Sequence, residues 1–141
     1  MNLEVIAKMF YISNQKESIQ IEEVKKLLKQ TYWAQNRSED LIRLSMNHSE
    51  CYGAYLKSTN QQIALARVIT DYVSAYYICD VIVDEKYRGL GIGKKLINTI
   101  VSDERFKNLR GLLVTADAHG LYEKYGFSRA TDWYMGKEPT Y

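Results

Sequence analysis

Proline and cysteine are almost absent from this chain of 141 residues, which has one proline and two cysteines. With only eight glycines and no low-complexity run, the composition excludes a collagen-like or disordered protein. The two cysteines, Cys51 and Cys79, cannot form a disulfide framework, and neither lies in a Cys-x-x-Cys motif. We therefore expect a protein of a reducing compartment, the cytoplasm.

Long apolar runs and a strong charge imbalance are also missing. No stretch approaches the roughly 18 apolar residues that a membrane-spanning helix needs, and the first residues lack the basic-then-apolar layout of a signal peptide. With 19 basic and 17 acidic side chains, the net charge of +2 gives no broad basic surface for nucleic acid. These absences leave one globular domain, residues 1–141, without a membrane or nucleic-acid partner.

Apolar residues recur with strand and helix periods in turn, which predicts a mixed α/β sheet flanked by helices. The expected order is β-α-α-β-β-β-α-β-α-β, with neither an internal repeat nor a linker. Strands are expected at residues 3–12, 51–57, 62–70, 75–83 and 111–115, and from Phe127 onward. Helices are expected at residues 21–30, after the N-cap residue Ser38, at residues 91–102, and at residues 118–125 before the terminating Gly126.

The most informative segment is a glycine-rich loop between the apolar strand end and the helix at residues 91–102. It contains Arg88, Gly89, Leu90, Gly91, Ile92, Gly93 and Lys94. Glycine lets the backbone turn sharply and approach a ligand closely. The first amides of a helix have no intrahelical partner and lie at the positive end of the helix dipole. A pyrophosphate group suits such a site.

Two well-known phosphate-binding loops do not match this segment. The GxxxxGK[ST] pattern needs a different gap and a Ser or Thr after the lysine, and GxGxxG fails because Lys94 stands at its third glycine. The pattern that remains is Arg88-x-x-Gly91-x-Gly93. From the loop alone, two alternatives stay open: a solvent-facing glycine-rich turn, and a generic nucleotide-phosphate site.

This Arg-x-x-Gly-x-Gly pattern, after an apolar strand and at the start of a helix, resembles the acetyl-CoA signature of the GNAT N-acetyltransferase superfamily. Residues 115–127 resemble the second signature of that superfamily, Ala-x-x-Leu-Tyr-Glu-Lys-x-Gly-Phe. The resemblance covers about residues 50–130. Thr115 departs from it, because the family typically has asparagine there. Residues 66–71 and 117–122 are also similar to a group of bacterial GNAT proteins of mostly undefined substrate.

The resemblance implies a role for each matching position. It implies that Val81, Ile82 and Val83 pair with the pantetheine arm of acetyl-CoA, with a main-chain N–H polarising the acetyl carbonyl. The pyrophosphate is expected on residues 88–94, and Tyr122 near the sulfur. The implied activity is direct transfer of an acetyl group from acetyl-CoA to a primary amine of a small molecule or peptide. A homodimer is also a common arrangement in the family.

Acid and base candidates follow from the chemistry of acetyl transfer. The departing thiolate needs a proton, and the phenol of Tyr122 can donate one; the alternative is a tyrosine that only packs beneath the last strand. An alkyl amine must lose its proton, and Asp80 and Asp71 are candidate carboxylates that would act through water. Each could instead be an exposed carboxylate of a turn or strand end. His119 fits a structural histidine better than a proton relay, and no metal site is expected.

The acceptor site is the least defined part of the sequence. Trp33, Asp71 and Tyr72 are substrate-binding candidates, since aromatic rings suit a cationic or aromatic amine. Trp33 could equally be an anchor between the two N-terminal helices. A catalytically silent CoA-binding module on the same fold is the alternative function.

Overall fold

The computed structural model describes residues 2–140 and contains a mixed, five-stranded sheet with strand order β1-β2-β3-β4-β5. The strands are β1 (Phe10–Ser13), β2 (Glu50–Leu56), β3 (Gln62–Thr70), β4 (Ala75–Val83) and β5 (Arg110–Leu113). The pairs β1–β2, β2–β3 and β3–β4 are antiparallel, and β5 is parallel to β4. The expectation of a mixed sheet is therefore confirmed.

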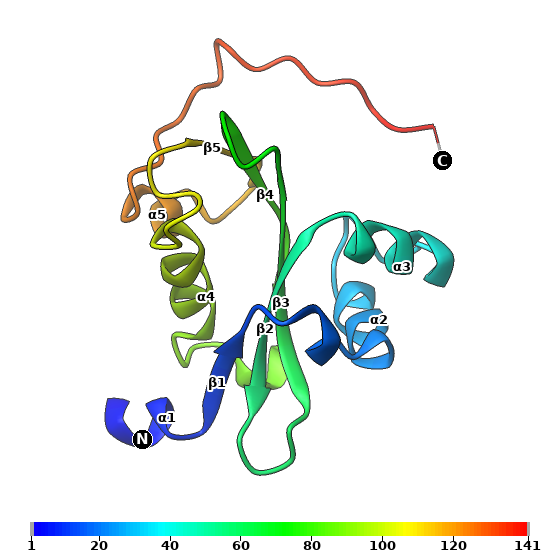
Figure 1. Cartoon of the computed structure of the whole chain (residues 1–141), viewed down its shortest axis with the longest axis vertical. Helices are drawn as coiled ribbons and strands as arrows, with labels where there is room; N and C mark the ends of the chain where they lie inside the picture. The colour runs from blue at the N-terminus through cyan, green and yellow to red at the C-terminus, as the bar shows by residue number, and fades with distance from the viewer. Residues whose placement is uncertain (1, 141) are drawn as a thin grey trace.

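Helices cover both faces of the sheet (Figure 1). They are α1 (Leu3–Ala7), α2 (Ile21–Lys29), α3 (Glu39–Asn47), α4 (Ile92–Val101) and α5 (His119–Glu123), with 3₁₀ turns η1 (Lys16–Ser18) and η2 (Glu85–Tyr87). The α2 and α3 helices lie on one face, and α4 and α5 on the other. Each face has its own apolar core. Within residues 2–140, no helix is long and apolar enough to cross a membrane.

The local sequence explains where the helices lie. In α2 the apolar side chains recur with the helical period, so that Val24, Leu27 and Leu28 are buried against the sheet. The α3 helix begins after Ser38, whose hydroxyl accepts a hydrogen bond from the Leu41 amide at 3.3 Å. Such a cap satisfies an amide that has no partner within the helix. Both predicted N-terminal helices are confirmed.

The strand expected at residues 3–12 is wrong over its first half. Residues 3–7 form α1, which the Asn2 side chain caps by accepting from the Val5 amide at 2.9 Å. The β1 strand starts only at Phe10, which pairs with Leu56, the last residue of β2. Before Phe10 the chain therefore has no strand beside it, and a helical turn satisfies its backbone groups locally.

The strand expected after Phe127 is also wrong. Gly126 ends the last helical turn as predicted, with a φ of +91°, and the Phe127 amide donates to the Tyr122 carbonyl. The half-buried Phe127 ring packs on the core beside α5. Residues 128–140 form no strand and run away from the sheet along an extended path (Figure 1).

Two features of β4 shape the sheet where a site can form. The register of β3 with β4 changes by one residue around Ala66, so Asp80 and Val81 together face this single residue. Asp80 has a φ of +50°, and the irregularity is a β-bulge. In addition, β5 pairs with β4 only as far as Ile78. From residue 79 to residue 83, no described strand pairs with the edge of β4 that faces β5.

Candidate active site

The glycine-rich loop adopts the backbone geometry that its sequence predicts. Gly89 and Gly91 have φ values of +81° and +83°, which favour glycine. Gly91 is the N-cap of α4, and no side chain caps this helix end. The first amides of α4 are thus free to bind an anion. Gly93 lies inside the first turn, where an added Cβ would be 3.8 Å from the Val83 side chain.

A cavity of about 380 Å³ opens at this loop. Its walls come from the end of β4, the loop, the first turn of α4, and α5. They are formed by Val83, Tyr87, Arg88, Gly89, Gly91, Ile92, Gly93, Lys94 and Leu121. Arg88 is oriented by its Nε, which donates to the Val83 carbonyl at 3.0 Å. The cavity thus combines two cationic side chains with free helix amides, the chemistry that holds a pyrophosphate.

The unpaired part of β4 leads away from this cavity. Burial alternates along it: Ile82 is buried on the α2–α3 face, while Val81 and Val83 are half-buried on the α4 face. Beyond Ile78 the backbone N–H and C=O groups on the β5 side have no strand partner among the described residues. An extended ligand arm can bind such an edge as a further strand would.

Tyr122 lies on α5, one residue after Leu121 of the cavity wall. Its side chain is buried in the core on the α4 face, with its ring edge-on to Phe127 at 6.0 Å between centroids. Burial raises the pKa of the phenol, and the charge of Asp117 adds to this. Among residues 2–140 the hydroxyl has no hydrogen-bond partner in the structure. With its pKa raised in this way, the Tyr122 phenol stays protonated at physiological pH.

Two side chains that the sequence analysis did not single out for this purpose hold α5 in place. Thr115 accepts from the Ala118 amide at 3.0 Å, which positions the start of the helix. The Tyr125 hydroxyl donates to the Lys94 carbonyl at 3.2 Å and so ties α5 to the first turn of α4. These contacts link the helix that carries Tyr122 to the glycine-rich loop. Thr115, which stands where the family typically has asparagine, thus supports the start of α5.

Asp80 is buried at the β4 bulge and is bound by three donors. Arg37 donates to its carboxylate at 2.7 and 3.3 Å, Arg67 at 2.9 Å, and the Trp33 indole N–H at 3.2 Å. Burial alone would raise the pKa of this carboxyl, but the two guanidinium groups hold the pKa below its usual value. A carboxylate held in this way is a poor proton acceptor. Its contacts argue against the general-base role expected from the sequence.

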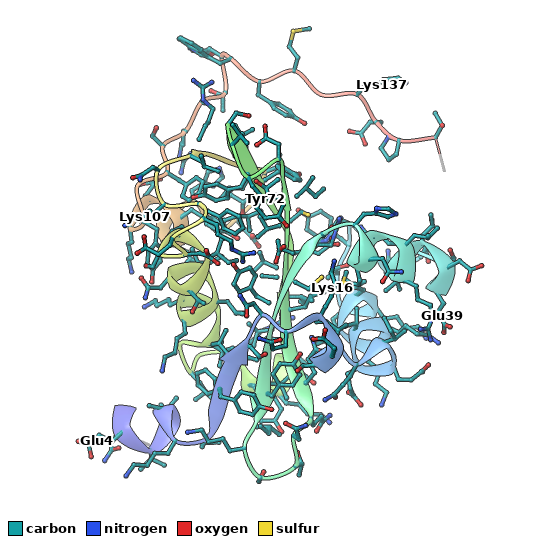
Figure 2. The ribbon with its side chains drawn as sticks, in the orientation of Figure 1. Glu4, Lys16, Glu39, Tyr72, Lys107 and Lys137 are labelled. Atoms are coloured by element: carbon teal, nitrogen blue, oxygen red, sulfur yellow. The ribbon has the colours of Figure 1, made fainter. Side chains whose placement is uncertain are left out.

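The structure places Asp71 and Tyr72 away from the glycine-rich loop, at the opposite end of β4. Asp71 accepts from the Ser74 hydroxyl and from the amides of Ser74 and Val73 in the β3–β4 turn, and these bonds keep its pKa well below the usual range. Tyr72 is exposed at the same turn and donates to Glu50 (Figure 2). Both act as turn residues here. Trp33, by contrast, lies beside Asp80.

A family model for the acetyltransferase (GNAT) domain matches residues 47–129. This chain belongs to the GNAT acetyltransferase family. A GNAT-family acetyltransferase structure from Xanthomonas campestris is 32% identical, with a TM-score of 0.85 over 92% of this chain and 93% of that one. The GNAT resemblance expected from the two signatures is therefore confirmed.

Two curated relatives are more distant. Serotonin N-acetyltransferase 2 of rice, a chloroplastic protein, is 29% identical over 71% of this chain and 52% of its own length. The chain thus spans about half the length of that relative. The N-acetyltransferase ycf52 of Porphyra purpurea is 25% identical over 92% of this chain and 76% of its own length.

GNAT acetyltransferases take their acetyl group from acetyl-CoA. A GNAT structure from Elizabethkingia anophelis, which is similar in fold (TM-score 0.62, 23% identity, 84% of this chain and 76% of that one), holds acetyl-CoA. The residues of this chain fit that molecule, because the cavity offers free amides and cations to its pyrophosphate and β4 offers an unpaired edge to its pantetheine arm. Among residues 2–140, no group of three or more metal-ligating side chains could hold a metal ion.

Proposed function

We propose that this chain is an acetyl-CoA-dependent N-acetyltransferase that transfers the acetyl group directly to a primary amine. One observation supports the proposal: the walls of the cavity at the glycine-rich loop include Val83, where the unpaired edge of β4 ends, and Leu121, which precedes the buried Tyr122 on α5. A pyrophosphate, a pantetheine arm and a leaving sulfur occur in that order in acetyl-CoA. We expect the cavity to bind the pyrophosphate, the edge of β4 to bind the pantetheine arm, and Tyr122 to lie near the sulfur.

Acetyl-CoA would be bound by backbone groups more than by side chains. The free amides of residues 92–94 would bind the pyrophosphate, with Arg88 and Lys94 supplying positive charge. The N–H and C=O groups from Val81 to Val83 would pair with the amides of the pantetheine arm. One of the β4 amides, next to the bulge, would donate to the acetyl carbonyl and stabilise the negative charge that develops on its oxygen.

Acetyl-CoA supplies an activated thioester, and the chain supplies the proton that its sulfur needs on leaving. Tyr122 is the proposed donor, since its buried phenol follows Leu121 of the cavity wall on α5. Because burial raises its pKa, the phenol stays protonated until the thiolate departs. Asp80 does not fit the complementary role of base. An amine with a lower pKa, or one that loses its proton to water, would need no carboxylate.

The acceptor would enter from the α2–α3 face, where Trp33 lies next to the bulge. Tyr32 and Trp33 are exposed and meet edge to face, with ring centroids 5.0 Å apart. An aromatic surface of this kind attracts cationic and aromatic amines. The rice relative is named for serotonin, an amine of that class. We therefore include arylalkylamines among the acceptors to be tested.

The test is acetyl transfer by the purified chain. Acetyl-CoA is mixed with serotonin, phenethylamine, spermidine, lysine, and a tripeptide with a free α-amine, and free CoA thiol is measured. Mass spectrometry then identifies an acetylated product. Amine-dependent release of CoA with an N-acetyl product supports the proposal. Acetyl-CoA binding without release for any amine would instead support the catalytically silent binding module.

A further inference from the structure

Asp80 links two elements that would lie on different sides of the reacting groups. Its donors Trp33 and Arg37 belong to residues 30–38, which connect α2 to α3, and its third donor, Arg67, belongs to β3. Its own backbone forms the bulge of β4. With 3% of its side chain exposed, the carboxylate is enclosed by these contacts. Asp80 thus joins the segment beside the proposed amine site to the strand beside the proposed acetyl-CoA site.

Two sets of contacts hold the connecting segment. Thr31 and Ala34 are buried, and the Thr31 hydroxyl accepts from the Ala34 amide at 3.0 Å. Trp33 and Arg37, by contrast, meet the sheet through Asp80. Arg67 also donates to Ser49 at 2.9 Å, so its guanidinium is fixed in two directions. Asp80 therefore fastens the segment to a rigid part of the sheet.

The same contacts hold the bulge. A non-glycine residue with a positive φ is strained and persists where its surroundings fix it. The left-handed backbone of Asp80 is fixed here by charge-assisted hydrogen bonds from two arginines. The bulge in turn sets the direction of the amides that follow it in β4. Loss of the carboxylate would release both the segment and the bulge.

We propose that Asp80 is a positioning residue that sets the segment of residues 31–37 against the bulge of β4, and so orients the acceptor amine toward the acetyl group. The inference rests on the proposed function for its catalytic consequence. Its structural consequence, the fastening of the segment, can be measured without turnover. The glycine-rich loop has separate supports, the Arg88–Val83 and Tyr125–Lys94 hydrogen bonds. Acetyl-CoA binding should therefore depend little on Asp80.

The test compares variants that separate the carboxylate from the backbone. Asp80→Gly keeps the positive φ without strain and removes the side chain. Asp80→Asn tolerates the same φ and keeps an oxygen for Trp33, but removes the charge. Trp33→Phe removes one hydrogen bond and keeps an aromatic ring. Asp40→Asn, at an exposed position in the first turn of α3, is the matched control.

Three quantities are measured for each variant: amide hydrogen exchange of residues 31–37 without ligand, the Kd of acetyl-CoA by calorimetry, and the KM of the fastest amine in the panel. For Asp80→Gly we expect at least tenfold faster exchange in this segment and at least a tenfold higher KM. The Kd should change less than threefold. Asp80→Asn should fall between Asp80→Gly and the wild type, and Asp40→Asn should match the wild type.

Two results would overturn the proposal. One is unchanged exchange of residues 31–37 in folded Asp80→Gly; the other is an equal loss of acetyl-CoA and amine binding. Should Asp80→Gly not fold, faster exchange confined to residues 31–37 in Trp33→Phe supports the proposal, and unchanged exchange contradicts it. If the wild type acetylates no amine, the proposed function fails, while the exchange of this segment still decides whether Asp80 fastens it.

Discussion

At the scale of single residues, the Tyr122 hydroxyl distinguishes an enzyme from a binding module. Tyr122→Phe keeps the ring and its packing on Phe127, and removes only the proton donor. We expect kcat to fall by about 10²–10³ with the Kd of acetyl-CoA nearly unchanged, because the proton is needed only in the transition state. Steady-state kinetics and calorimetry measure the two effects. A wild-type kcat in the folded variant would show that water protonates the thiolate.

Arg88 is the second residue whose role can be isolated. Arg88→Ala should weaken binding of acetyl-CoA more than binding of acetyl-pantetheine, which has the same thioester arm but no pyrophosphate. The reason is that the Arg88 guanidinium in the cavity wall would bind the negatively charged pyrophosphate, which only acetyl-CoA carries. Calorimetry with both compounds gives the two losses. Equal losses would show that Arg88 supports the loop, through its bond to the Val83 carbonyl, without binding the pyrophosphate.

At the scale of elements, we predict that acetyl-CoA binding depends on the turn from β4 into α4. Gly91 caps α4 with a φ of +83°, so Gly91→Val introduces both backbone strain and a side chain at the free amides. We expect acetyl-CoA to bind at least tenfold more weakly, about 1.4 kcal/mol. Asn98→Val is the control, because it puts the same side chain at an exposed position of the same helix. Unchanged affinity in folded Gly91→Val would place the pyrophosphate elsewhere.

Elements with a strong local pattern could be predicted from the sequence, and those decided by distant partners could not. The expected strands 62–70 and 75–83 agree with β3 and β4 at both ends, since apolar residues and turn residues mark them. The turn at the glycine-rich loop could be predicted in the same way, because its own glycines determine it. The bulge was not visible, because Asp80 is held by residues 13, 43 and 47 positions away. The first half of the strand predicted at residues 3–12 is wrong for the same reason, because the last residue of β2, Leu56, pairs with Phe10.

At the scale of the whole molecule, the sheet carries different chemistry on its two faces. The glycine-rich loop, α4 and Tyr122 lie on one face, and the segment that meets Asp80 lies on the other (Figure 1). The bulge of β4 is where the two faces connect. An acetyl group at the bulge would be reached by CoA from one side and by an amine from the other. The homodimer and the cytoplasmic location expected from the sequence stay predictions.

The stability of the protein in acid should depend on the ion pairs of two buried or half-buried aspartates. Asp80 is paired with arginines at the bulge, and Asp103 is bound by Arg105 and Tyr52 beyond α4; these partners lower the pKa of both carboxyls. A carboxyl whose pKa is lower in the folded state stabilises the protein above its unfolded pKa, about 3.9 for aspartate. That stability is lost as pH falls toward the folded pKa, because the unfolded chain then binds more protons.

We therefore expect the free energy of unfolding, measured with urea at pH 7, 5, 4 and 3, to fall steeply below about pH 5. Asp103→Asn and Asp80→Asn should each be less stable at pH 7 and less sensitive to acid, by up to about 1.4 kcal/mol per pH unit, the slope for one proton. Asp132→Asn, in the exposed C-terminal segment, should keep the wild-type slope. A wild-type slope in both Asp103→Asn and Asp80→Asn would mean that other carboxylates control the acid unfolding.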